Sequence, residues 1–171
     1  VYGVFDLCGR RNTDACWTTT TTSRVQKSEL REQDIYEEGE DDFINREVSH
    51  RQEYRLVTQN ALDNKKGFFI TLLPPSNAAE GERVTGPAIV GFSNRVIFTT
   101  EIPNNDPCSN GTSGWIMEID PFSGGRTDFS VFDMNADGYF NHSDQTGGSD
   151  GTILTIRRAP GGATAAILHA A

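Results

Sequence analysis

The sequence predicts an all-β fold, mainly antiparallel, because short runs rich in β-branched and aromatic residues recur along the chain. Turns separate these runs, and Phe92-Ser93-Asn94-Arg95 has the composition of a hairpin turn. The segment Gln52–Thr58 shows strand-like alternation as well. The other expected strands are Val1–Leu7, Gly67–Leu73, Val84–Gly91, Arg95–Ile102, Trp115–Ile119, Thr152–Arg157 and Thr164–Leu168.

Short strands with long loops are also typical of the blades of a β-propeller. At about 40–50 residues per blade, the chain would supply only about three or four blades, and an incomplete ring leaves sheet edges unpaired. Residues 1–171 are therefore expected to form a single segment of a propeller domain within a longer protein. Val1–Leu7 reads as the middle of a buried strand without an initiator Met, which favours a mature or cleaved segment.

A long polar insert, at about residues 8–52, interrupts the strand pattern. Its threonine tract Thr18–Thr22 favours extended backbone. Ser28, followed by good helix formers as far as Gln33, predicts one short helix with Ser28 as its N-cap. The acidic run Glu37–Asp42 is interpreted as a solvated loop, with a calcium site as the alternative.

The charge balance narrows the classes of partner. The chain has 15 Lys and Arg against 24 Asp and Glu, a net charge of -9. This balance argues against a nucleic-acid partner, whose phosphates need clustered cations, and suits a surface that attracts divalent cations. No apolar run approaches the roughly 20 residues that span a bilayer, so we expect no membrane span.

Three cysteines bear on the compartment. Cys8 and Cys16 flank a polar turn, and we favour a disulfide between them in an oxidising compartment. Three buried thiols are the alternative. Cys108 would then be free or paired beyond this segment, and the spacing of the cysteines does not match a zinc site.

The loop Asp133–Asp144 has the spacing of a calcium-binding loop, with oxygen donors at positions 1, 3, 5, 7, 9 and 12. Gly138 at position 6 permits the sharp turn, and Asp144 has a shorter reach than the usual Glu. A metal-free surface turn is the alternative. Phe129–Phe132 reads as a strand, so the loop would fasten a connection between strands. The predicted ligands of Ca²⁺ are Asp133, Asn135, Asp137, the Tyr139 carbonyl, Asn141 and Asp144.

An ordered series of motifs precedes this loop: Gly81–Val84, Arg95–Pro103, Asp106–Cys108, Gly114–Asp120, Gly124–Arg126 and Val131–Asp133, with Lys65–Phe69 before them. The series resembles the C-terminal propeller of PilY-type type IV pilus proteins. It covers about residues 65–144, nearly half of the chain. Thr152–Ala171 matches only loosely, and the insert is less familiar.

The resemblance implies a modified β-propeller in a pilus-associated protein that supports pilus assembly, tip adhesion and surface motility. The implied partners are minor pilins or other pilus components, and the remainder of a longer chain. The implied location is the cell surface or pilus tip, after passage through the periplasm.

In this family a nine-residue loop binds calcium and governs the balance between pilus extension and retraction. It maps onto Asp133, Asn135, Asp137, Tyr139 and Asn141, with Asn141 in place of the usual carboxylate.

Two other classes remain open. A quinoprotein-type propeller enzyme would also use calcium, but it needs a ring-stacking Trp and a catalytic Asp. Trp17 and Trp115 are the only tryptophans, and Asp120 reads as strand-end structure. A calcium-stabilised lectin-type adhesin is the other alternative. We therefore expect a non-enzymatic binding or assembly module.

Overall fold

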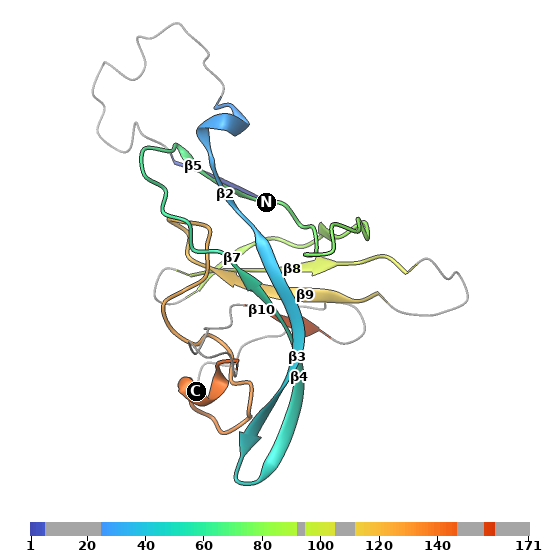
Figure 1. The fold of residues 1–171 in the computed structure, drawn as a ribbon. Coiled ribbons are helices and arrows are strands. Elements are labelled where there is room, and N and C mark those ends of the chain that lie inside the picture. Colours follow the sequence, from blue (N-terminus) through green and yellow to red (C-terminus); the bar gives the residue numbers. More distant parts are fainter. Residues whose placement is uncertain (6–24, 92–94, 105–111, 147–155, 160–171) are drawn as a thin grey trace, which may run out of the picture.

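The computed structural model describes residues 1–5, 25–91, 95–104, 112–146 and 156–159, in which strands predominate (Figure 1). The strands and the two single-turn 3-10 helices are β1 Tyr2–Val4, η1 Lys27–Glu29, β2 Arg31–Gln33, β3 Ile35–Asn45, β4 Val48–Val57, β5 Gly67–Ile70, β6 Arg83–Val84, β7 Ile89–Gly91, β8 Arg95–Glu101, β9 Gly114–Ile119, η2 His142–Asp144 and β10 Ile156–Ala159. None of the helices in this part of the chain has the length and hydropathy needed to cross a bilayer.

The strands form two open sheets. The larger sheet has seven strands in the order β3-β4-β10-β9-β8-β6, with β7 also paired to β8. All of its pairings are antiparallel, which confirms the predicted class. The smaller sheet has the order β1-β5-β2, in which β2 runs parallel to β5. Neither sheet closes on itself among the described strands, so the structure does not show a propeller, and the propeller segment stays a prediction.

Two apolar clusters lie on opposite faces of β9. Trp115, Met117 and Ile119 point into the cluster shared with β5, and this cluster joins the two sheets. Ile116 packs against the second cluster, which holds Tyr54 and the chain that follows β9. The alternation along β9 is the period of two expected for a strand buried on both faces.

The part of the polar insert that the structure describes differs from the prediction. The short helix is reduced to η1, whose N-cap is Gln26 rather than Ser28. The acidic run Glu37–Asp42 is not a loop but the middle of β3, paired along its length with β4. The hairpin β3–β4 is long and extends well beyond the rest of the sheet (Figure 1).

Cross-strand partners explain why so acidic a segment forms a strand. Arg51 of β4 pairs with Glu40 at 2.7 Å, and Tyr54 Oη donates to a Glu37 carboxylate oxygen at 2.7 Å. Burial and this hydrogen bond raise the pKa of Tyr54 to about 12. Gly39 lies opposite Tyr54, where a Cβ would come within 2.9 Å of the phenol oxygen. The ring therefore uses the space that a side chain would fill.

The prediction of a buried strand at Val1–Leu7 is wrong for the described residues. Only Tyr2–Val4 form a strand, and the Tyr2 and Val4 side chains are 66% and 55% exposed. The reason is position, because β1 is the edge of the smaller sheet and pairs only with β5 among the described strands. An apolar sequence at a sheet edge cannot be distinguished from a central strand by composition.

The remaining strand predictions agree in place but differ in their bounds: β5 and β8 are shorter than predicted, whereas β4 and β9 start earlier. The predicted hairpin around residues 92–94 is confirmed by the pairing of Gly91 with Arg95, although the turn residues lie outside the described part. The predicted strand Val84–Gly91 is divided into β6 and β7. Thr18–Thr22 and Thr164–Leu168 also lie outside the described residues.

Candidate metal centre

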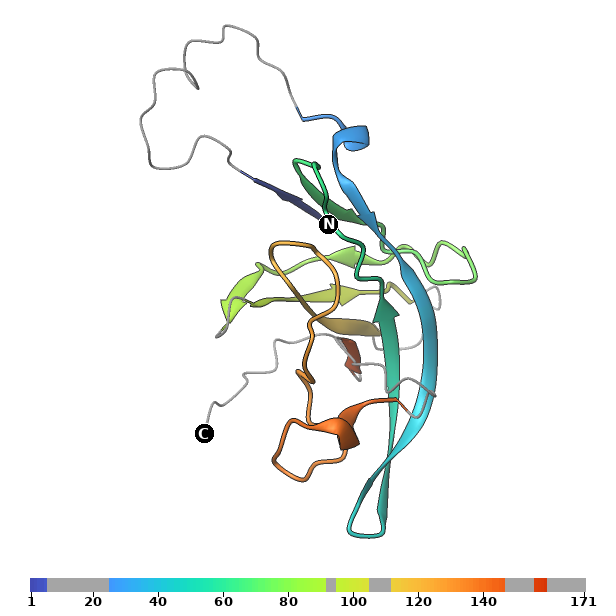
Figure 2. The same cartoon turned by 60° about the vertical axis from the view of Figure 1, so that its left-hand side comes forward.

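The chain after β9 carries the predicted calcium loop across one face of the larger sheet and beside the β3–β4 hairpin (Figure 2). It starts with a turn in which Asp120 Oδ1 accepts hydrogen bonds from the backbone N–H groups of Phe122 and Ser123, both at 2.7 Å. Asp120 is thus strand-end structure, as expected. The second apolar cluster then anchors the segment through Phe43, Tyr54, Leu56, Val131, Phe132 and Met134.

The strand predicted at Phe129–Phe132 does not form. Val131 and Phe132 are buried, but they pack in the cluster over the face of the sheet and pair with none of the described strands. A short apolar run predicts burial, and here burial comes from packing on the hairpin rather than from a place in a sheet.

Two of the predicted ligands, Asp133 and Asn135, converge on one peptide N–H, that of the third predicted ligand, Asp137. Asp133 Oδ1 and Asn135 Oδ1 both accept the backbone N–H of Asp137, at 3.0 and 3.1 Å. Asp133 Oδ2 accepts the N–H of Gly138 at 2.9 Å, and Asn135 Nδ2 lies 3.2 Å from Asp137 Oδ2. The loop therefore brings two carboxylates and one amide together within five residues.

Backbone conformation makes this convergence possible. Gly138 has φ 84°, in the left-handed region that glycine enters without steric cost. Ala136 also lies in that region, with φ 57°, and its carbonyl accepts a hydrogen bond from Asn45 Nδ2 at 3.0 Å. A hydrogen bond from the β3–β4 hairpin thus supports the loop at Ala136, a non-glycine residue in the left-handed conformation.

Asn141 and Asp144 are used differently. Asn141 Oδ1 accepts the N–H of Ser143 at 2.8 Å, and Asp144 Oδ2 accepts the N–H of Asn141 at 2.9 Å, which forms a capping box on η2. Asp144 Oδ1 also accepts the backbone N–H groups of Met134 and Asn135, at 2.8 and 3.3 Å. The fully buried Asp144 carboxylate therefore ties the end of the loop to its start.

Tyr139, whose carbonyl is the predicted ligand at position 7, continues the turn. Its N–H donates to Asp137 Oδ1 at 2.8 Å, and its side chain is exposed. The Asp137 carboxylate therefore accepts one N–H within the loop and presents its second oxygen beside Asn135.

The loop carries net negative charge without a cationic partner in the described structure. Asp133, Asp137 and Asp144 are absent from the ion pairs formed by the described residues. No group of three or more His, Cys, Asp or Glu side chains in this part of the chain is arranged to hold a metal ion. Any cation in the loop would thus need amide and backbone oxygens beside Asp133 and Asp137.

The residues weighed for a quinoprotein site have structural roles where the structure describes them. Trp115 is buried in the core, and the Arg55 guanidinium lies over its ring at 4.3 Å from the centroid. Trp17, Cys8, Cys16 and Cys108 lie outside the described residues, so the disulfide stays a prediction.

One buried charged cluster was missed by sequence reasoning. Arg55 is fully buried on β4 and donates through Nη1 and Nη2 to both carboxylate oxygens of Glu82, at 2.8 and 2.9 Å. Its Nε donates to Glu38 at 2.6 Å. Glu82 lies 27 residues away in the sequence, and no local pattern indicates the pair.

Glu118 on β9 is another buried acid, with Arg95 as its ion-pair partner at 2.6 Å. Burial raises the pKa of Glu118 to about 7, against the opposing effect of Arg95. The ion pairs of both clusters join residues in or next to the larger sheet, so we assign both clusters to the fold.

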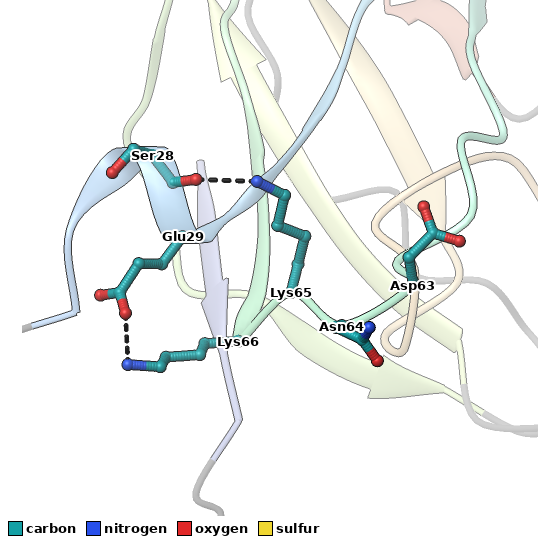
Figure 3. A pocket seen from close by; sticks show the side chains of 6 residues that line it. All are labelled: Ser28, Glu29, Asp63, Asn64, Lys65 and Lys66. Carbon is teal, nitrogen blue, oxygen red and sulfur yellow. Dashed lines mark hydrogen bonds and ion pairs between the residues drawn. The ribbon is translucent and has the colours of Figure 1, made fainter.

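A surface hollow of about 400 Å³ lies beside η1, lined by Ser28, Glu29, Asp63, Asn64, Lys65 and Lys66 (Figure 3). Its cations are engaged by neighbouring groups. Lys65 Nζ donates to the Ser28 carbonyl at 2.8 Å, and Lys66 forms an ion pair with Glu29. The hollow therefore offers no free cation that would mark it as an anion site.

Comparison with known proteins relates the chain to one group. No family model matches it. Type IV pilus biogenesis factor PilY1 of Pseudomonas aeruginosa strain PAO1 is 26% identical over 126 residues, which are 69% of this chain and 10% of that protein. The PilY1 homolog of Xylella fastidiosa strain Temecula1 is 37% identical over 79 residues, 42% of this chain and 6% of that protein.

A solved structure extends the likeness to the fold. The crystal structure of the Pseudomonas aeruginosa PilY1 C-terminal domain matches 94% of this chain with a TM-score of 0.76 and 21% sequence identity. The chain is similar to PilY-type proteins in sequence and in fold. It matches 31% of that solved chain and a tenth or less of the length of the curated PilY1 relatives. The predicted resemblance to PilY-type proteins is thus confirmed.

Proposed function

We propose that this chain is a non-enzymatic module of a type IV pilus-associated protein and that its loop Asp133–Asp144 binds calcium. The pilus association rests on the curated relatives, which are named type IV pilus biogenesis factors. The calcium site rests on one observation above others, the convergence of Asp133 and Asn135 oxygens on the Asp137 N–H.

The residues fit a calcium ion better than other metals. Asp133, Asn135 and Asp137 offer hard oxygen donors, and the Tyr139 carbonyl completes the protein ligands that we propose. Calcium accepts six to eight oxygens at varied angles and takes waters where protein ligands are lacking. Magnesium requires a stricter octahedron, which a loop built on two left-handed residues is not arranged to impose. Bound there, the ion would neutralise carboxylates that otherwise repel one another.

We assign Asn141 and Asp144 a bracing role rather than ligation. The Asp144 carboxylate is fully buried and holds the start of the loop to η2 through three backbone N–H groups, and the Asn141 side chain caps η2. Their contribution to calcium binding would come through the shape of the loop, as supporting residues commonly contribute in metal sites.

The wider role remains part of the proposal. We propose that the open sheets are part of a larger modified β-propeller, because the chain matches less than a third of the related solved domain. The apolar, exposed side chains of Tyr2 and Val4 at the edge strand β1 suit contact with the remainder of a longer chain. Minor pilins or other pilus components are the proposed partners, in assembly, tip adhesion and motility at the cell surface or pilus tip.

Calorimetry of calcium binding tests the site. Asp133→Ala and Asp137→Ala should each abolish measurable binding, because each removes a charged ligand. Asp34→Ala is the matched control, since Asp34 is an exposed aspartate between β2 and β3, away from the loop. The proposed site would be refuted if both loop variants bound calcium as tightly as the unmodified chain.

A further inference from the structure

The turn end of the β3–β4 hairpin is fastened to the candidate calcium loop by two hydrogen bonds that run in opposite directions. Asn135 Nδ2 donates to the Ile44 carbonyl at 3.2 Å. Asn45 Nδ2 donates to the Ala136 carbonyl at 3.0 Å. Each bond joins residues 91 positions apart in the sequence, and the two segments lie side by side in both views (Figures 1 and 2).

Apolar packing supports the same junction. Phe43, next to this end of the hairpin, is 2% exposed and belongs to the cluster that holds Met134 of the loop. β3 also contacts η2, which ends the loop. The hairpin end and the loop are therefore packed as one unit, so a change in the conformational order of one segment changes that of the other.

Asn135 links the two directly through a single planar amide. Its Oδ1 faces the loop interior, where it accepts the Asp137 N–H, while its Nδ2 reaches the hairpin. Oxygen and nitrogen of an amide are conjugated, so positive charge near Oδ1 makes the Nδ2 hydrogens stronger donors. Hydrogen bonds arranged in series polarise one another in this way.

Asn45 contacts the peptide group between Ala136 and Asp137, whose N–H donates to Asn135 and whose carbonyl accepts from Asn45. Its partner Ala136 stands between Asn135 and Asp137 and holds the left-handed conformation that lets both of these side chains turn inward. A non-glycine residue in this conformation needs support from its surroundings. The Asn45 side chain supplies that support from outside the loop.

We propose that the end of the β3–β4 hairpin is coupled to the calcium loop, with Asn45 as a positioning residue for the loop and with the hairpin end ordered when a cation is bound. The inference rests on the calcium site of the proposed function. Coupling of this kind is reciprocal, so loss of the Asn45 contact weakens calcium binding by the factor by which calcium orders the contact. The exposed side chains of Ile44 and Val48 then have a defined arrangement only in the loaded protein.

Amide hydrogen exchange of the full chain, with and without calcium chloride, tests the coupling. Calcium should slow exchange at residues 43–49 by about tenfold or more, and Asn45→Ala should remove this response while it weakens calcium binding by about threefold to tenfold. Ser49→Ala is the matched control, because the Ser49 hydroxyl donates to Asp42 within the hairpin rather than to the loop. The control should keep both the exchange response and the affinity.

The outcomes separate this inference from the site on which it rests. Normal calcium binding with unchanged exchange at residues 43–49 would overturn the coupling and leave the calcium site intact. An exchange response that survives in Asn45→Ala would overturn the role of Asn45. Absence of any calcium binding by the unmodified chain would refute the proposed site and the coupling with it. Circular dichroism checks that each variant is folded.

Discussion

Replacement of Asp144 tests whether its carboxylate supports the loop through hydrogen bonds or binds calcium directly. Its buried carboxylate accepts three backbone N–H groups, those of Met134, Asn135 and Asn141. Asp144→Ala leaves these donors without their acceptor, and a buried donor that loses its partner costs about 1–3 kcal/mol. Because the effects are not additive, we expect a loss of about 3 kcal/mol of unfolding free energy.

Asp144→Asn is the finer test. One amide oxygen can still accept the N–H groups of Met134 and Asn135, but the amide nitrogen would face the N–H of Asn141. The expected loss is one charged hydrogen bond, about 1.5–3 kcal/mol. At about 2–4 °C per kcal/mol for a chain of this size, the melting temperature should fall measurably for both variants.

Thermal unfolding in EDTA provides the assay, because a brace acts without metal. Calcium affinity, measured in parallel, should fall by about tenfold in Asp144→Asn, as expected for a supporting residue. The reasoning would be refuted by an unchanged melting temperature in EDTA together with complete loss of calcium binding. That result would make Asp144 a ligand.

Three further predictions concern the fold. Burial raises the pKa of Glu118 to about 7, so between its ordinary 4.5 and 7 the folded protein holds a proton that the unfolded chain releases. Unfolding free energy should therefore fall as pH rises through this window, by at most about 3 kcal/mol, and Glu118→Gln should reduce this dependence on pH. Urea titrations at several pH values measure it, and the same dependence on pH in both proteins would contradict the prediction. Arg55→Met leaves Glu82 buried without its cation and should cost about 3–5 kcal/mol in the same titrations, whereas a loss below about 1 kcal/mol would show that the pair is dispensable. Mass spectrometry without reductant should find Cys8 bonded to Cys16, which closes a short loop worth about 2–3 kcal/mol, and free thiols at both positions would remove that reason for expecting an oxidising compartment.

Local sequence predicted the strands whose side chains alternate or are continuously apolar. β5, β8 and β9 were found because β-branched and aromatic residues fill them, and the hairpin of β7 and β8 because its turn is short and polar. The acidic strand β3 was missed. Its stability depends on Arg51, Tyr54 and other groups of β4, and a pattern of like charges gives no sign of partners across a hairpin.

The sequence also predicted some features of the candidate site and not others. Donor spacing predicted that Asp133, Asn135 and Asp137 would converge, because these residues share one tight turn. The same spacing gave no indication that the Asp144 carboxylate accepts N–H groups at the start of the loop. It also gave none that Asn45 supports the loop, since that contact depends on a packing of distant segments.

A crystal structure of the chain, from crystals grown with calcium chloride, tests most directly the central claim that the loop binds calcium. We predict one ion within about 2.3–2.6 Å of oxygens from Asp133, Asn135, Asp137 and the Tyr139 carbonyl, with the Asp144 carboxylate still bound to backbone N–H groups. A loop without an ion at millimolar calcium, in which Asp133 and Asn135 still accept the Asp137 N–H, would contradict the proposed function.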